Sequence, residues 1–252
     1  MISFNKEQIY IVTGASSGLG EATALLLNKL GATVVGIARN KERLEAMRAK
    51  CQFPENMFLE QKDLIEDIES LPKYVKSLKG KYGKFSGMAY CAGITGIYPL
   101  QTLDYNIAKK VFSVNYFAPL LFTKGLLDRR NNIGDGTSCV YISSIDAKTC
   151  TRGQSLYSGT KAGLSATVKA ISKEVSTQGI RMNCVLPSMI KTPMTIDEFS
   201  TLTGVTEDMQ ATTYPFGWGE PNDVANMIVY LLSDKAKFIS GQNYVIDSGG
   251  VL

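Results

Sequence analysis

Histidine is absent from this chain of 252 residues. A chain without imidazole cannot be a Ser-His-Asp hydrolase, a Cys-His protease or an HExxH zinc protease, and it cannot form zinc sites that need imidazole ligands. Any proton transfer near neutral pH must therefore use another group, namely a carboxylate, a tyrosine, a lysine or a cysteine.

Closely spaced cysteines and long apolar runs are missing as well. The five cysteines form no CxxC pair, so the sequence predicts no thiolate metal site. An odd cysteine count fits a reducing compartment. No apolar signal core follows Met1, and no run approaches the ~18 apolar residues of a membrane helix. We therefore expect a cytoplasmic protein with no metal and no membrane partner.

Charge of either sign is not in marked excess. The 27 Lys and Arg residues against 23 Asp and Glu residues leave a net charge of +4, without a dense basic cluster. A nucleic-acid or membrane surface is therefore not expected. The 44% hydrophobic and 20% charged residues are ordinary for a globular chain and exclude a mainly disordered one.

Strand-like and helix-like segments alternate along the whole chain. The strand candidates are Gln8–Thr13, Ala32–Ile37, Met57–Gln61, Gly87–Cys91, Cys139–Ser143, Arg181–Leu186 and Tyr244–Ile246. The helix candidates are Leu19–Leu30, Lys41–Lys50, Glu66–Lys79, Tyr105–Arg130, Ser155–Gln178 and Asn222–Ser233. Alternation implies parallel strands, and nearly all-apolar strands imply a sheet covered on both faces. The sequence predicts one α/β domain over residues 1–252, with a doubly wound parallel sheet in three layers.

A glycine-rich turn follows the first strand, at Thr13-Gly14-Ala15-Ser16-Ser17-Gly18-Leu19-Gly20. Glycines allow a tight turn and a close backbone approach to a pyrophosphate, and the helix that starts there offers free N–H groups. An ordinary βα turn is the alternative. The position of the glycine-rich turn within a βαβ pattern favours dinucleotide binding over this alternative.

The end of the second strand indicates which dinucleotide binds. An acidic residue about 20 residues after the glycines bonds the ribose of NAD, whereas an arginine accommodates the 2′-phosphate of NADP. Here Ala38 stands in place of the acid and Arg39 follows it, with Lys41 and Arg43 close behind. Arg39 could instead be a solvated charge at a helix entrance. We expect NADP(H) as the cofactor.

Tyr157 and Lys161 stand four residues apart and would share one face of a helix. A phenol titrates near 10, but a neighbouring cation favours the phenolate and lowers its pKa. Tyr157 can then exchange a proton with a carbonyl or alcohol oxygen without histidine. Further back, Asn115 precedes Pro119 by one helical turn, and since proline has no N–H, the Asn115 carbonyl is free to hold a water. A simple helix kink is the alternative.

These motifs together resemble the short-chain dehydrogenase/reductase family. The similar stretches are the GxxxGxG turn at Gly14, Gly18 and Gly20, then Lys62-Asp63-Leu64, Ala92-Gly93, Asn115, Ser144, Tyr157 with Lys161, Pro187-Ser188-Met189-Ile190-Lys191-Thr192, and the chain end from Ile239 to Gly250. Two departures are Tyr90-Cys91, where the family has two asparagines, and Ser188, where it has glycine. The resemblance runs from Thr13 to about Gly250 and implies a Rossmann-type fold.

The resemblance also implies roles for individual residues. The catalytic residues would be Asn115, Ser144, Tyr157 and Lys161. The cofactor contacts would be Gly14, Ser16, Ser17, Gly18, Leu19, Gly20, Arg39, Asp63, Leu64, Ala92, Gly93, Tyr157, Lys161, Pro187, Ile190 and Thr192. Ser143 is a neighbouring candidate for the catalytic serine, and Asp63 could be a helix cap rather than an adenine contact. In the family, the last strand and nearby helices form tetramer contacts, so we expect a homo-oligomer, a tetramer or a dimer.

The expected activity is hydride transfer between a nicotinamide and a small-molecule carbonyl or alcohol, with Tyr157 as general acid and base. NAD-dependent alcohol oxidation on the same site is one alternative, and a non-catalytic dinucleotide sensor or scaffold is another. Residues 192–214, with Met194, Phe199 and Met209, resemble the family's substrate lid. Candidate wall residues of the substrate pocket are Ile94, Tyr98, Asp146, Cys150 and Gln154. They fit a sugar, an acyl thioester, a polyol or a small ketone equally.

Overall fold

The expected strands pair into one parallel sheet in the computed structural model, which describes residues 1–250 apart from the side chain of residue 198. The strands are β1 (Ile9–Thr13), β2 (Thr33–Ala38), β3 (Met57–Gln61), β4 (Gly87–Tyr90), β5 (Ser138–Ile142), β6 (Arg181–Pro187) and β7 (Asn243–Ile246). Their order is β3-β2-β1-β4-β5-β6-β7, and all six pairings are parallel. The doubly wound, Rossmann-type fold is thus confirmed as a single domain. Residues 251 and 252 of the predicted domain lie outside the described residues.

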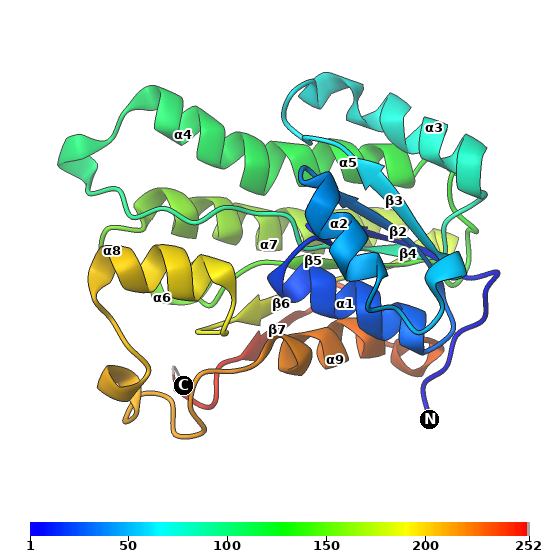
Figure 1. Ribbon diagram of the computed structural model, residues 1–252. Helices are drawn as coiled ribbons and strands as arrows, with labels where there is room; N and C mark the ends of the chain where they lie inside the picture. The colour runs from blue at the N-terminus through cyan, green and yellow to red at the C-terminus, as the bar shows by residue number, and fades with distance from the viewer. Residues whose placement is uncertain (251–252) are drawn as a thin grey trace.

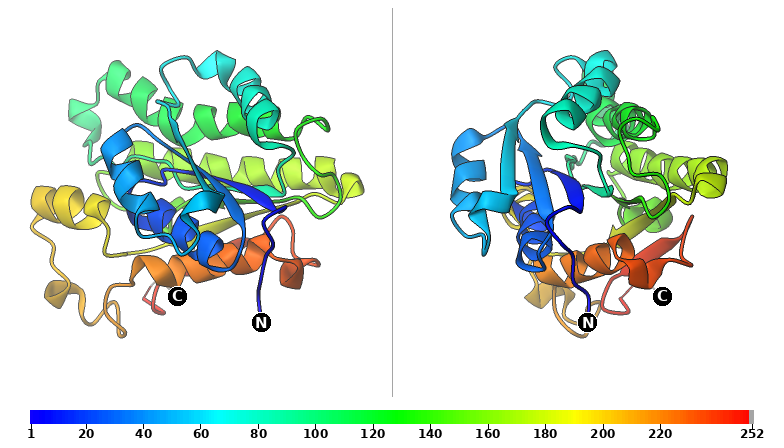
Figure 2. Two further views of the ribbon diagram at one scale, coloured as in Figure 1. Left: turned by 45° about the vertical axis from the view of Figure 1, so that its right-hand side comes forward. Right: turned by 90° about the vertical axis from the view of Figure 1, so that its right-hand side faces the viewer.

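Helices cover both faces of the sheet (Figures 1 and 2). The helices are α1 (Gly18–Lys29), α2 (Lys41–Arg48), α3 (Leu71–Tyr82), α4 (Tyr105–Phe112), α5 (Ala118–Leu126), α6 (Asp146–Thr149), α7 (Ser155–Val175), α8 (Thr201–Thr203) and α9 (Pro221–Leu232). One face packs against α1, α2 and α9, and the other against α3, α5 and α7. This is the three-layer arrangement that nearly all-apolar parallel strands require.

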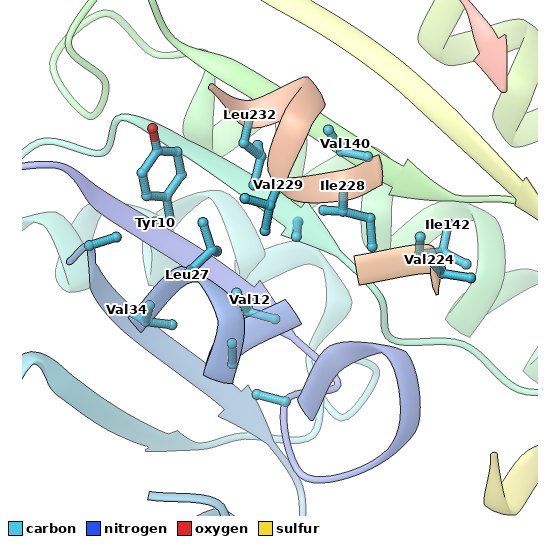
Figure 3. Close-up of a cluster of buried hydrophobic side chains, with 14 of the residues drawn as sticks. Tyr10, Val12, Leu27, Val34, Val140, Ile142, Val224, Ile228, Val229 and Leu232 are labelled. Atoms are coloured by element: carbon cyan, nitrogen blue, oxygen red, sulfur yellow. The ribbon is translucent and has the colours of Figure 1, made fainter. Parts of the chain in front are cut away.

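The core beneath α1 and α9 is built from alternate residues of the strands (Figure 3). Val12 of β1, Val34 of β2 and Val140 of β5 meet Leu27 of α1 and Ile228 of α9, and all five are fully buried. Fully burying one such side chain contributes about 1.5–3 kcal/mol. The residues between them on each strand face the opposite core, so neither face of the sheet is left to solvent.

Two predicted helices differ from the observed ones, in each case because of a proline. The segment predicted as one helix over Tyr105–Arg130 is α4, a π-helical turn (η4, Ser113–Phe117) and α5. Pro119 lacks the N–H that would continue the α-helical ladder, and the π turn absorbs the break. The helix predicted over Glu66–Lys79 starts only at Leu71, because Pro72 favours the first turn of a helix.

The order in which strands are added to the sheet reverses at β1 and β4, which are parallel neighbours although two strands separate them in the sequence. In doubly wound folds, a crevice opens at the carboxyl ends of the strands at such a switch point, and ligands bind there. Thr13 ends β1 and Tyr90 ends β4 at this edge. The glycine turn, Ala92-Gly93 and the loops after β5 and β6 all start from it.

Candidate active site

A cavity of about 530 Å³ lies at this edge of the sheet. All of the residues that the sequence predicts as cofactor contacts line it, and so does Ser144. Three of the five predicted substrate-wall residues line it too, namely Ile94, Asp146 and Gln154. Tyr98 and Cys150 do not, so the structure contradicts their placement in the wall: the Tyr98 N–H is hydrogen bonded to the Gly153 carbonyl at 2.7 Å, and the Cys150 thiol is exposed.

The glycine turn forms a close-fitting cradle. Gly14 has φ of +69°, and a Cβ there would lie 3.0 Å from the backbone nitrogen of Ala92. A Cβ on Gly20 would overlap the carbonyl oxygen of Gly14, so the helix can pack this tightly on the turn only with glycine. Ser17 caps α1 without a side-chain hydrogen bond, which leaves the first N–H groups of this 12-residue helix available to an anion. The residues present therefore fit a pyrophosphate.

Exposed cations stand where the second strand ends. Arg39 and Arg43 line the cavity, and neither guanidinium forms an ion pair within residues 1–250. Asn40 caps α2 by accepting a hydrogen bond from the Arg43 N–H at 2.7 Å, which anchors the start of the helix beside Arg39. Asp63 accepts a hydrogen bond from the Ile65 N–H at 3.1 Å, so its carboxylate shapes the local turn while it lines the cavity.

Thr13 ties the two central strands together, a role that sequence analysis missed. Its buried hydroxyl oxygen accepts hydrogen bonds from the N–H groups of Cys91 and Ala92, both at 3.1 Å. These bonds hold the start of the Ala92-Gly93 segment against the glycine turn. Burial raises the pKa of the Cys91 thiol to about 12, in agreement with a packing role for this cysteine rather than a reactive one.

Asn115 lies behind the cavity wall instead of in it. Its side-chain amide accepts a hydrogen bond from the Ile94 N–H and donates one to the Ile94 carbonyl, both at 2.9 Å. The π turn carries Asn115 to this position, 1% exposed. A Cβ on Gly93 would lie 3.3 Å from the Asn115 Oδ1 and 3.4 Å from the Lys161 Nζ, so this glycine lets Asn115 and Lys161 come close to the same backbone segment.

Helix α7 presents Tyr157 and Lys161 to the cavity. The Lys161 ammonium donates a hydrogen bond to the Ile142 carbonyl at 2.8 Å and lies 5.6 Å from the centre of the Tyr157 ring. Burial lowers the pKa of Lys161 to about 8. The Tyr157 pKa is raised to about 12, because burial outweighs the opposing effect of the Ser144 side chain. The lowering of the Tyr157 pKa expected from the sequence is thus not found in the protein alone.

The two candidate serines have different partners. Ser144 lines the cavity, its side chain opposes the rise of the Tyr157 pKa, and its hydroxyl accepts a hydrogen bond from the Asp146 N–H at 3.2 Å. The Ser143 hydroxyl donates to the Lys161 carbonyl at 2.9 Å and accepts from the Ser165 hydroxyl at 2.8 Å. Ser143 therefore holds α7 against the sheet, and Ser144 is the serine whose hydroxyl is left for the cavity that Tyr157 also lines.

The loop after β6 closes the other side of the cavity. Thr192 packs against Gly18, where a Cβ would lie 3.2 Å from the threonine methyl group. Ser188, which replaces a family glycine, has no left-handed backbone, and its N–H donates to the Ile246 carbonyl at 3.0 Å. Because no positive φ is needed there, serine fits without strain.

The segment predicted as a lid holds short helical turns, at Met194–Ser200 (η6), Thr201–Thr203 and Asp208–Gln210 (η7). Met194, Phe199 and Tyr214 line the cavity, whereas Met209 is 70% exposed and does not. The Lys191 ammonium pairs with Glu207 at 3.1 Å and with Glu220 at 3.4 Å, which connects this segment to the start of α9.

Metal-binding clusters of His, Cys, Asp and Glu are not found within residues 1–250. Across the same residues, every helix is too short or too polar to span a bilayer.

Comparison with known proteins places the chain in a family. A family model described as "Enoyl-(Acyl carrier protein) reductase" matches residues 14–250. The chain is 29% identical to the 3-oxoacyl-[acyl-carrier-protein] reductase FabG of Thermotoga maritima, covering 97% of this chain and 98% of the relative. The chain belongs to the short-chain dehydrogenase/reductase family. This family comprises oxidoreductases that act on carbonyl and alcohol groups with nicotinamide cofactors.

Other members of the short-chain dehydrogenase/reductase family extend the comparison. An L-rhamnose 1-dehydrogenase (NAD(P)(+)) of Sphingomonas sp. is 29% identical, covering 95% of this chain and 94% of the relative. A solved short-chain dehydrogenase/reductase of Brucella melitensis, described as a glucose/ribitol dehydrogenase, superposes with a TM-score of 0.90 at 25% identity and full coverage of both chains. The resemblance stated from the sequence is confirmed at the level of the family.

Proposed function

We propose that this protein is an NADP(H)-dependent carbonyl reductase in which Tyr157 is the general acid. The observation that carries the proposal is that Ser144, Tyr157 and Lys161 line one cavity together with the glycine turn, with the Lys161 ammonium 5.6 Å from the centre of the Tyr157 ring. The opposing sensor or scaffold hypothesis requires none of these side chains to meet.

Each side chain has a defined task in this proposal. A bound reduced nicotinamide would supply the hydride, with its electron pair, to the carbonyl carbon. Tyr157 gives its hydroxyl proton to the carbonyl oxygen, so the phenolic O–H bond breaks as the alcohol O–H bond forms. Ser144 orients that oxygen and stabilises the charge developing on it. The raised Tyr157 pKa keeps the phenol protonated before the reaction, and the carbonyl oxygen becomes basic enough to take the proton as the hydride reaches the carbonyl carbon.

Lys161 and Asn115 would restore the proton. The Lys161 ammonium stabilises the phenolate left after transfer and binds the nicotinamide ribose. Asn115 would hold a relay water on its backbone carbonyl, since Pro119 has no N–H to occupy that oxygen in the next turn. Its side chain is fully engaged with Ile94, so the backbone carbonyl is the group we assign to the water.

NADP(H) preference rests on the cations at the end of β2. Arg39 and Arg43 are exposed, line the cavity and form no ion pair within the described residues, so both are available to a 2′-phosphate. Ala38 supplies no carboxylate to repel it. Asp63 and Leu64 would lie beside the adenine, and Pro187, Ile190 and Thr192 beside the nicotinamide.

The assembly and location are also proposals. Phe117 is 46% exposed beside Phe112 and Tyr116, and Tyr105 is 77% exposed on the same helical stretch. Exposed aromatic residues of this kind favour a homo-oligomer, dimer or tetramer. All five cysteines are free, which supports a reducing cytoplasm. Light scattering on the purified protein measures the oligomeric state directly.

The proposed function is tested by a fluorescence titration with NADPH and with NADH, followed by an absorbance assay of NADPH oxidation with a panel of carbonyl compounds. We expect tighter binding of NADPH and turnover with at least one carbonyl. Equal or tighter NADH binding would favour alcohol oxidation instead. Binding of NADPH without turnover of any carbonyl or alcohol would favour the sensor.

A further inference from the structure

The wall of the cavity between β5 and α7 carries two polar side chains that the proposed mechanism does not use. Asp146, the first residue of α6, is 9% exposed, and Gln154, just before α7, is 4% exposed. Both line the cavity. Polar groups this deeply buried are normally hydrogen bonded, so their partners show what the wall is built to hold.

One oxygen of the Asp146 carboxylate is held by the turn that follows it. Oδ1 accepts hydrogen bonds from the Thr149 hydroxyl and the Thr151 N–H, both at 3.2 Å, and a further one from the Thr151 hydroxyl. Cys150 between them is left-handed, with φ of 54°, and this bend folds the turn around the carboxylate. The other oxygen, Oδ2, accepts no hydrogen bond from any residue in the described range.

The Gln154 side chain has no partner at all within residues 1–250, although its backbone is fixed. Its N–H donates to the Thr151 carbonyl at 3.0 Å, and its carbonyl accepts from the Ser158 N–H at 2.8 Å. The amide atoms are not among the fully buried polar atoms that lack a partner, so they are accessible from the cavity, where a bound molecule can pair with them. The amide can both donate and accept.

Asp146 adjoins the serine that would hold the reacting oxygen, and Gln154 lines the same cavity. The Asp146 N–H donates to the Ser144 hydroxyl at 3.2 Å. Ser144, Asp146 and Tyr157 line the same cavity, and both Ser144 and Asp146 influence the pKa of Tyr157. Tyr214, the last residue of the predicted lid, lines the same cavity, and Asp146 influences its pKa. A substrate carbonyl bound by Ser144 and Tyr157 therefore places its neighbouring carbon atoms beside a free carboxylate oxygen.

The chemistry of this wall selects a class of substrate. A free carboxylate oxygen accepts a hydrogen bond, an amide donates and accepts, and a hydroxyl group satisfies both. A hydrocarbon chain would leave both groups unpaired, and an anionic group next to the carbonyl would be repelled by Asp146. We propose that the substrate is a hydroxylated carbonyl compound of the sugar or polyol class, with a hydroxyl on the carbon next to the carbonyl. This proposal rests on the proposed reductase function.

The test compares matched substrates that differ only in hydroxyl groups. The values of kcat/KM for NADPH-dependent reduction would be measured with hydroxyacetone against acetone, erythrulose against butanone, and the acetoacetyl thioester of N-acetylcysteamine. A hydrogen bond to a charged group corresponds to roughly 10- to 100-fold, so we expect the hydroxylated member of each pair to be favoured by that factor. The thioester should be reduced less efficiently than erythrulose.

Three variants locate the preference in the wall. Asp146→Ala and Gln154→Leu should each lower the ratio of kcat/KM for hydroxyacetone to kcat/KM for acetone by roughly tenfold. Asp146→Asn keeps an oxygen for the Thr149–Thr151 turn but turns a donor toward the cavity, so it tests the charge without dismantling the turn. Lys148→Ala, an exposed position on the same short helix that does not line the cavity, is the control and should keep the ratio.

The outcomes separate this proposal from the one on which it rests. Reduction of acetone, butanone or the thioester with a kcat/KM equal to or above that of the hydroxylated compounds would overturn the substrate class alone. An unchanged ratio in Asp146→Asn, Asp146→Ala and Gln154→Leu would overturn the assignment to this wall. If no carbonyl compound is reduced while NADPH still binds, the reductase function itself fails, and the substrate proposal fails with it.

Discussion

Replacement of Arg39 by alanine should weaken NADPH binding and leave NADH binding unchanged. Arg39 is exposed at the end of β2, lines the cavity and has no carboxylate partner in the described chain. Its guanidinium is therefore free to form charge-assisted hydrogen bonds with a 2′-phosphate, whereas NADH presents a hydroxyl at that position.

The size of the effect follows from this exposure. A hydrogen bond between charged groups contributes about 1.5–3 kcal/mol, and solvent screening at an exposed site places Arg39 at the lower end of that range. A loss of about 1.5 kcal/mol is about tenfold in Kd. Arg43 lines the same part of the cavity, so the double variant should lose more affinity than Arg39→Ala alone.

The assay is a fluorescence titration of the wild type and of Arg39→Ala with each cofactor, at low and at high salt. Added salt should reduce the preference of the wild type, because it screens exposed charges. Lys41→Ala is the matched control, since Lys41 is exposed at the start of α2, two residues after Arg39, but does not line the cavity. An equal loss of NADPH and NADH affinity in Arg39→Ala, or no loss of either, would refute the reasoning.

Three further predictions concern the site. In a pH–rate profile, kcat for reduction should fall as the pH rises through about 8, because burial lowers the pKa of Lys161 to about 8 and reduction needs the Lys161 ammonium. In Lys161→Arg the side chain keeps its charge, so the fall in kcat should move to higher pH. Ser144→Ala should lower kcat by roughly 100-fold or more, whereas Ser143→Ala should chiefly lower the midpoint of urea unfolding. A large loss of kcat in Ser143→Ala and of stability in Ser144→Ala would exchange the roles of the two serines. Thr13→Val leaves two buried N–H groups unpaired and should lower the free energy of unfolding by about 2–5 kcal/mol, while Thr13→Ser should retain most of it in the same denaturation assay.

Most of the fold could be predicted because the strands are nearly all apolar and the connecting segments are helical. The predicted strand at Met57–Gln61 matches β3 residue for residue, and each of the others differs by one residue at one end or at both. The helix over 105–130 was wrong where Pro119 breaks it. The proline predicts an interruption, but only the packing of Asn115 against Ile94 makes that interruption a π turn. The four-residue helix α6 is too short to give a periodic pattern.

The sequence predicted which residues form the site, but it did not predict how their surroundings shift their pKa values. Spacing along α7 places Tyr157 and Lys161 on one face, and the structure brings both to the cavity. The direction of the Tyr157 pKa was not predictable, because it depends on how deeply the fold buries the phenol. The hydrogen bonds that the Thr13 hydroxyl accepts from Cys91 and Ala92 were also not predictable. These partners lie far along the chain, and only the pairing of β1 with β4 brings them near.

The central claim is that Tyr157 transfers the proton during carbonyl reduction at this cavity. The most direct measurement pairs two readouts on Tyr157→Phe: the Kd for NADPH by fluorescence and kcat for the best carbonyl substrate by NADPH oxidation. The account predicts a Kd close to that of the wild type and the loss of nearly all turnover, because phenylalanine keeps the ring and removes only the proton donor. A variant that turns over at the rate of the wild type would contradict it.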